Sequence, residues 1–203
     1  ETSFFPLKGL PLIEKSNGHF FSKDYATSVI LEEGIIFDDT GKVIDIAGSS
    51  FFIKDSRIKP SPAEILISAD GALSSISQVL NKPPLKLLDR VQQPVNFGNA
   101  KVSGKGRVEV LLKSNLTSDE ITYEVKGTAK EFSSRVINPD FIISNGTLDF
   151  FADKKGLEIK GNAKVKDLPI QAKLLGSLAK DEPKFLEIYF SLSEKVLEML
   201  PDG

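Results

Sequence analysis

The side chains that could perform acid–base or metal chemistry are few and scattered in this sequence. Its single histidine, His19, follows Asn17-Gly18 and stands beside Phe20 and Phe21, where it could titrate near neutral pH or hold a metal ion. Protein metal sites use several converging ligands, and the chain has no second histidine and no cysteine to supply them. We therefore predict a surface or strand position for His19 and no metal site.

Neighbouring carboxylates, at Asp38-Asp39 and Asp119-Glu120, are the other candidates for acid–base chemistry. Both pairs stand beside turn-forming residues, where acidic side chains cap the backbone and face water, so we interpret them as solvated turns. A carbohydrate-active enzyme would need two carboxylates about 5–10 Å apart in a cleft, a geometry that the sequence leaves open. Serine is plentiful, but neither a Gly-x-Ser-x-Gly elbow nor a Gly-x-x-x-x-Gly-Lys-Ser/Thr phosphate loop occurs. The sequence thus predicts no enzyme, no catalytic residue and no cofactor.

Net charge and amino-acid composition narrow the classes of function that remain. The 26 Lys and Arg residues face 28 Asp and Glu, and the net charge of -2 lacks the basic excess of nucleic-acid-binding proteins. The absence of cysteine excludes disulfides and thiolate chemistry, and it fits a reducing cytoplasm or a bacterial periplasm. No stretch reaches the roughly 20 apolar residues of a membrane-spanning helix, so an anchor or export signal would lie outside this sequence.

Strict alternation of apolar and polar side chains is the strongest structural signal in the sequence. From Val102 to Leu112 one side of the chain is apolar or glycine and the other is mostly charged, and the pattern repeats from Ile121 to Lys130 as a long hairpin. It continues from Leu157 to Val165 and from Leu168 to Leu174, which predicts antiparallel strands with one wet face. Shorter strands are predicted at 27–31, 35–38, 43–47, 51–54 and 63–69.

Turns and short helices are predicted between these strands. Glycine supplies positive φ cheaply, so we place turns at Glu33-Gly34, Thr40-Gly41, Asn145-Gly146 and Lys155-Gly156. Helical spacing of Leu73, Ile76, Val79 and Leu80 predicts a helix between Ala72 and Leu80, with Asp70 as its cap and Pro83-Pro84 as its stop. Further short helices are predicted around 85–91 and 193–200.

The chain is long enough for one sizeable core, and we predict a single β-rich segment of a longer protein over residues 1–203. The helical interruption at 71–97 is a candidate sub-boundary between a short-stranded and a long-stranded part. Gly98-Asn99-Ala100-Lys101-Val102 is echoed by Gly161-Asn162-Ala163-Lys164-Val165, which fits either chance or a repeated strand module.

The apolar face of the predicted sheet is the most informative feature for function. A strand from Val102 to Leu112 spans about 36 Å at about 3.3 Å per residue, more than a few short helices can cover. We therefore predict an elongated, strongly curved, mainly antiparallel sheet, groove-like or taco-like, whose concave apolar face contacts acyl chains. The predicted lipid-binding residues are Val102, Val108, Val110, Ile121, Tyr123, Val125, Leu148, Phe150, Leu157, Ile159, Val165, Leu168 and Ile170.

The competing hypothesis is a structural or protein-interaction β-module whose apolar face is simply its closed core. Adjacent aromatic pairs such as Phe20-Phe21 and Phe150-Phe151 put one ring on each face of a strand. These rings fit ordinary packing in the core and beneath a helix or loop. They also fit an apolar groove or a docking edge for adjoining segments. The lysines of the polar face fit a wet sheet surface, and the alternative is a basic patch for anionic head groups. They are Lys101, Lys105, Lys113, Lys126, Lys130, Lys160 and Lys164.

The order of several stretches resembles a known family. They are Leu10-Pro11-Leu12-Ile13 leading to Asn17-Gly18-His19-Phe20, Ile65 to Gly71 and the helix before Pro83-Pro84-Leu85, Val102-Ser103-Gly104-Lys105-Gly106, and Asn145-Gly146-Thr147-Leu148 through 156–163 to Leu168-Pro169-Ile170. In this order the chain resembles the AsmA-like proteins of bacteria, in particular the large YhdP-like and TamB-like members.

This resemblance implies an internal segment of a long periplasmic protein that an N-terminal helix, absent from this sequence, anchors in the inner membrane. It implies that successive sheets form an open hydrophobic groove carrying phospholipid toward the outer membrane. The implied partners are phospholipid or another acyl-chain ligand and adjoining segments of the parent chain. The resemblance implies no catalysis.

Overall fold

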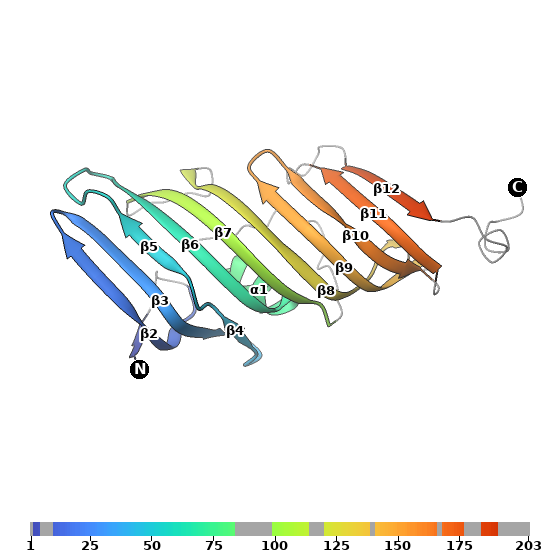
Figure 1. Ribbon diagram of the computed structural model, residues 1–203, viewed down its shortest axis with the longest axis horizontal. Coiled ribbons are helices and arrows are strands. Elements are labelled where there is room, and N and C mark those ends of the chain that lie inside the picture. The colour runs from blue at the N-terminus through green and yellow to red at the C-terminus, as the bar shows by residue number, and fades with distance from the viewer. Residues whose placement is uncertain are drawn as a thin grey trace, which may run out of the picture.

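The computed structural model describes residues 2–4, 10–83, 99–113, 120–138, 141–165, 168–176 and 184–190. The elements in chain order are β1 (Thr2–Phe4), β2 (Ile13–Lys23), β3 (Ala26–Phe37), β4 (Val43–Asp45), β5 (Ser50–Ile53), β6 (Ser61–Ala72), α1 (Leu73–Leu80), β7 (Lys101–Leu112), β8 (Thr122–Asn138), β9 (Phe141–Asp153), β10 (Leu157–Val165), β11 (Leu168–Gly176) and β12 (Lys184–Phe190). The strands form one 12-stranded antiparallel sheet. Figure 1 shows them side by side in one long row from β2 to β12.

This architecture confirms the predicted mainly β class and the antiparallel arrangement. The strong curvature of the sheet stays a prediction, as does the assignment of the chain to a longer protein. The sheet runs without a break from β6 to β7, where Ser61–Ala72 pairs along its whole length with Lys101–Leu112. The candidate sub-boundary at 71–97 thus lies in sequence between two strands that are direct neighbours in the sheet.

The sheet order follows the chain order except around β4 and β5. Both short strands lie between β3 and β6, where β4 pairs with one end of each long strand and β5 pairs with the other. Gly48, with a φ of 80°, lies between β4 and β5 and lets the chain turn without steric cost. Two short strands in succession therefore fill the gap between two twelve-residue strands.

Long regular strands were predicted well by alternation. β7, β10 and β11 agree with their predicted ranges within two residues, and β7 and β8 form the predicted hairpin. The predicted turns at Thr40-Gly41 and Lys155-Gly156 also lie between strands. Asp153 accepts the Gly156 amide through Oδ1, and Gly41 has a φ of 82°. Alternation of apolar and polar residues is therefore sufficient to predict long, regularly paired strands.

Two predicted turns are wrong, because Glu33-Gly34 lies inside β3 and Asn145-Gly146 lies inside β9. The register shifts near both places, and Asn145 has a φ of 50°. A β-bulge inserts an extra residue in an unusual conformation without ending the strand. These glycines therefore lie next to irregular pairing inside strands and do not join two strands.

The predicted helix is confirmed as α1, but its predicted cap is wrong. Ala72 occupies the N-cap position, and no side chain caps the helix. Asp70 is part of β6 and lies opposite Ser103, so it lies inside a strand and not at the N-cap position of the helix. The Leu73 amide instead donates to the carbonyl of Ala100 at 2.8 Å. The helices predicted around 85–91 and 193–200 lie outside the described residues.

Hydrophobic residues form separate clusters along the sheet. Ile76 and Val79 of α1 pack over a cluster around Ile44, whose side chain is 1% exposed. A second cluster contains Ala63, Val110 and Ile121, and a third contains Ile143, Ala163 and Ile170. The core is thus distributed along the length of the sheet, and α1 covers the N-terminal cluster.

Candidate functional site: the apolar face of the sheet

The register of the strands places the predicted lipid-binding residues on a single face. Residues directly opposite one another in antiparallel strands share a face of the sheet. The direct pairs among the predicted residues are Val108 with Tyr123, Phe150 with Ile159, and Val165 with Leu168. One continuous row on this face contains Val102, Ala129, Leu148, Gly161 and Ala172. We call it the apolar face.

The predicted residues differ in how far they are buried. The buried members are Val102, Val110, Ile121, Leu148 and Ile170. The partly exposed members are Val108, Tyr123, Val125, Phe150, Leu157, Ile159, Val165 and Leu168. Buried side chains serve the core in the structure as it stands, so the partly exposed group is the one that can contact a ligand directly.

Glycines shape the middle of the apolar face. Gly104 and Gly127 lie opposite each other, and a Cβ placed at Gly127 would be 2.7 Å from Cζ of Phe150. A Cβ at Gly104 would be 3.5 Å from the same atom. The Phe150 ring therefore covers two residues without side chains, which lets a large aromatic group lie close to the backbone of the sheet.

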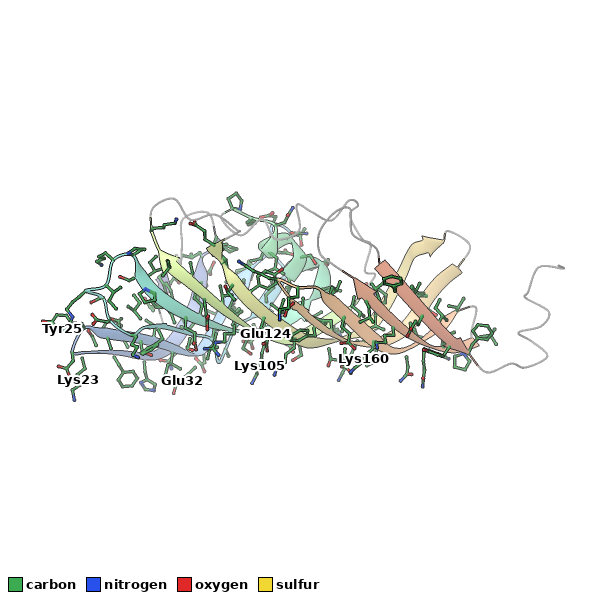
Figure 2. The ribbon with its side chains drawn as sticks, turned by 90° about the horizontal axis from the view of Figure 1, so that it is seen from above. Lys23, Tyr25, Glu32, Lys105, Glu124 and Lys160 are labelled. Carbon is green, nitrogen blue, oxygen red and sulfur yellow. The ribbon has the colours of Figure 1, made fainter. Side chains whose placement is uncertain are left out.

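The helix α1 lies on the same face but over its N-terminal part. Ile44 lies opposite Gly71, which in turn lies opposite Val102, so the cluster under α1 belongs to the apolar face. The principal contacts of α1 are with β4 and β6. Figure 2 shows α1 on one side of the sheet, with Lys105 and Lys160 labelled on the other. Within the described ranges, α1 is the only helix on the apolar face.

The opposite face, which we call the charged face, carries ion pairs and mixed side chains. Arg107 pairs with Glu64 at 2.5 Å and with Glu109 at 3.1 Å. Thr128 donates to Asp149 across β8 and β9 at 2.8 Å. Phe151, the neighbour of Phe150, points to this face and is 38% exposed. The adjacent aromatic pair therefore divides between the two faces, as predicted.

β12 and its contribution to the apolar face were not predicted from the sequence. Leu186, Ile188 and Phe190 lie opposite Leu174, Ala172 and Ile170, so they extend the face by one strand. All three are exposed, at 40–48%. β12 escaped detection because apolar residues occupy both of its sides, which hides the alternation. Its run of Phe, Ile and Tyr is typical of strands and could have revealed it.

The groups considered for acid–base or metal chemistry do not converge. His19 lies in β2, exposed and 3.0 Å from Glu32, which confirms the predicted strand position. Glu120 lies close to β8 and pairs with Lys113, while Asp119 lies outside the described residues. Among the described residues, no group of three or more His, Cys, Asp or Glu could hold a metal ion.

Asp38 is not the solvated turn residue that we predicted. It is buried, and its Oδ1 accepts from the Thr40 amide and hydroxyl and from the Lys42 amide. Its Oδ2 accepts from Oγ of Ser75 in α1 at 2.5 Å. Burial by itself raises the pKa of Asp38, but the hydrogen bonds from Ser75, Thr40 and Lys42 hold that pKa well below its usual value. The Asp38 carboxylate thus links α1 to the β3–β4 turn through hydrogen bonds.

Comparisons of this chain with protein-family models, curated proteins and solved structures find no match. None of the helical structure in the described ranges combines the length and the apolar composition of a membrane span. The apolar face is therefore the feature of the molecule from which a function can be inferred.

Proposed function

We propose that this chain is a non-enzymatic module of an AsmA-like envelope protein whose apolar face binds the acyl chains of phospholipid. The observation that supports this proposal is the continuity of partly exposed apolar side chains from β7 to β12. At about 4.8 Å per strand, these six strands make an apolar strip about 24 Å wide. The strip runs from one strand to the next, perpendicular to the strand direction. A groove that continues into adjoining sheets would run in this same direction.

The energetics of burial favour such a ligand. Each methylene group removed from water gains about 0.8 kcal/mol, so a dozen methylene groups gain up to about 10 kcal/mol before the cost of association. Most of the partly exposed side chains, including Val125, Leu157 and Ile159, offer only hydrocarbon to that contact, and Tyr123 adds one hydroxyl group. This composition selects for alkyl chains and against polar ligands.

In the parent protein, we propose that this segment lies in the periplasm and is anchored to the inner membrane through a segment outside this sequence. It would contribute to phospholipid transport between the inner and outer membranes, and so to outer-membrane integrity. The adjoining segments of the parent chain would continue the apolar strip. The family resemblance of the sequence and the antiparallel sheet support this placement.

The proposal is tested by substituting neighbouring residues on β10 that face opposite sides. Ile159→Asp puts a charge on the apolar face, whereas Lys160→Asp puts the same residue on the charged face. Native mass spectrometry and solvent extraction of protein purified from bacteria should recover phospholipid with the wild type and with Lys160→Asp, and not with Ile159→Asp. Circular dichroism checks that each variant is folded.

Equal lipid recovery with Ile159→Asp and Lys160→Asp would overturn the proposal. If Ile159→Asp fails to fold, Ile159→Ser and Lys160→Ser form a milder pair with the same readout. A lipid-free, well-folded wild type would instead support the structural or protein-interaction module. The buried cluster of Ala63, Val110 and Ile121 on the same face favours that second candidate, because it is packed as a closed core.

A further inference from the structure

We infer that the charged face binds a phosphate group between Lys105 of β7 and Lys126 of β8. These two residues lie directly opposite each other in the hairpin. Direct cross-strand partners have Cβ atoms about 4.5–5.5 Å apart, and like charges in this position destabilise the sheet. An anion held between the two ammonium groups would convert this repulsion into attraction. The site lies on the face away from the proposed lipid strip, so it does not rest on that proposal.

Several other cations of the charged face lie near carboxylates on neighbouring strands, whereas Lys164 lies opposite Ser144 and Pro169. Arg107 pairs with Glu64 and Glu109. Lys160 lies opposite Asp149, and Lys173 lies opposite Glu187. The same holds for Lys101, which faces Lys130 but has Glu131 at 3.6 Å. In the part of the chain that the structure describes, neither Lys105 nor Lys126 forms an ion pair.

The carboxylates around the lysine pair are diagonal or same-strand neighbours, since Glu124 lies opposite Arg107 and Asp70 lies opposite Ser103. Lys126 lies opposite Phe151 of β9, so the acidic residues on either side of Phe151 are only diagonal neighbours. Asp149 accepts the hydroxyl hydrogen of Thr128. Asp153 accepts the amides of Lys155 and Gly156 at the β9–β10 turn. Among the described residues, no carboxylate lies directly opposite Lys105 or Lys126, so an external anion can approach both ammonium groups.

A depression of about 230 Å³ lies at this position. Its lining is Ser68, Ser103, Gly104, Lys105, Lys126 and Gly127, which includes no carboxylate. Ser68 lies opposite Lys105 on the β6 side, so a hydroxyl stands next to the lysine pair. Two ammonium groups and two hydroxyl groups supply charge-assisted and neutral hydrogen bonds to a tetrahedral oxyanion. The chemical class of the ligand is a phosphate, either free or as the ester of a lipid head group.

The site is tested by thermal unfolding of the whole chain in increasing inorganic phosphate, with sodium chloride at matched ionic strength as the reference. Phosphate should raise the Tm of the wild type in a saturable way beyond the effect of chloride. Lys126→Gln should weaken the apparent phosphate affinity by about tenfold or more, because one of two ammonium groups is lost. Without phosphate and at low salt, the same variant should have a higher Tm than the wild type, since the repulsion is removed.

Lys173→Gln is the matched control, because it removes the same charge from the same face at a lysine that lies opposite a carboxylate. It should keep the phosphate response of the wild type. An equal phosphate response in Lys126→Gln and the wild type, or no response beyond chloride, would overturn the inference. Ile159→Asp should leave the response unchanged, so failure of the lipid proposal and failure of this site are separate results.

Vesicle flotation distinguishes the two sources of phosphate. If the ligand is a lipid head group, vesicles of phosphatidylglycerol and phosphatidylcholine should bind the wild type but not Lys126→Gln. A saturable phosphate response without vesicle binding would assign the site to free phosphate or a soluble phosphate ester. Absence of both would leave no phosphate site between Lys105 and Lys126.

Discussion

The two halves of the sheet cover the same apolar face in different ways. In the N-terminal half, α1 packs over the face, Ile44 is 1% exposed, and Asp38 fastens the helix to the β3–β4 turn. In the C-terminal half, the strands β7 to β12 carry buried apolar side chains, such as Val102 and Ile170, next to partly exposed or exposed ones, such as Ile159 and Ile188. In the first half a helix covers part of the apolar face, whereas in the second half buried and partly exposed apolar side chains lie together on a face that no helix of the described residues covers.

Backbone irregularities occur in both halves of the sheet, but at different places. The N-terminal half contains two short strands, a bulged β3 and positive φ values at Lys15, Gly41 and Gly48. The ends of β3, β4 and β6 pair with one another, and α1 contacts β4 and β6. β7 pairs with β6, and β10 with β11, without a register shift, whereas the pairing of β8 with β9 shifts register three times and that of β9 with β10 once. The apolar face nevertheless continues from β7 to β12, because Val102, Ala129 and Leu148 share it with Ala172 and Ile188.

The largest expected effect separates the two halves directly. Ile44→Ala should lower the free energy of unfolding by about 2–5 kcal/mol, because it opens a cavity in a closed core. Ile159→Ala should cost about 1 kcal/mol, since the side chain is already partly exposed. Urea unfolding followed by circular dichroism measures both losses. Equal losses would mean that the two halves are packed alike.

Loss of the Asp38 carboxylate should have the next largest effect. Asp38→Asn leaves one acceptor oxygen where the turn amides and Ser75 use two, so the variant should lose about 1–3 kcal/mol of stability at pH 7. The folded state holds the pKa of Asp38 below the unfolded value of about 3.9. The wild-type advantage should therefore be complete above that value and shrink as the pH falls below it.

Unfolding midpoints of the wild type and Asp38→Asn at pH 7 and pH 3 check this dependence. The gap between the two proteins should be smaller at pH 3. A gap that stays constant or widens on acidification would show that the carboxylate does not contribute through its charged form.

The smallest expected effect is at the exposed surface of the N-terminal half. Glu32→Gln removes the partner of His19, and both side chains are more than half exposed. Solvent screens such a pair, so the unfolding midpoint should not change measurably between pH 5 and pH 8. A clear loss of stability in this variant would show that the closed core depends on charges of the opposite face as well.

Alternation along 102–112 and 157–165 sufficed to predict β7, β10, their apolar face and the residues assigned to it. Three features could not be predicted without the three-dimensional structure. Gly34 and Gly146 were interpreted as turns, because bulges and turns use the same residue types. The burial of Asp38 depends on Ser75, which lies 37 residues away in the sequence. Lys105 and Lys126 face each other only through the hairpin register, which spacing alone does not specify.

The central claim is that acyl chains contact the apolar face and not the charged face. Phe150 and Phe151 provide the most direct test, because the two rings are adjacent in β9 and point to opposite faces. A photoreactive benzoylphenylalanine at either position should be irradiated in the bacterial cell, and cross-linked phospholipid should be detected by mass spectrometry. We predict cross-links at 150 and none at 151. Equal cross-linking at both positions, or none at 150, would contradict a lipid-binding apolar face.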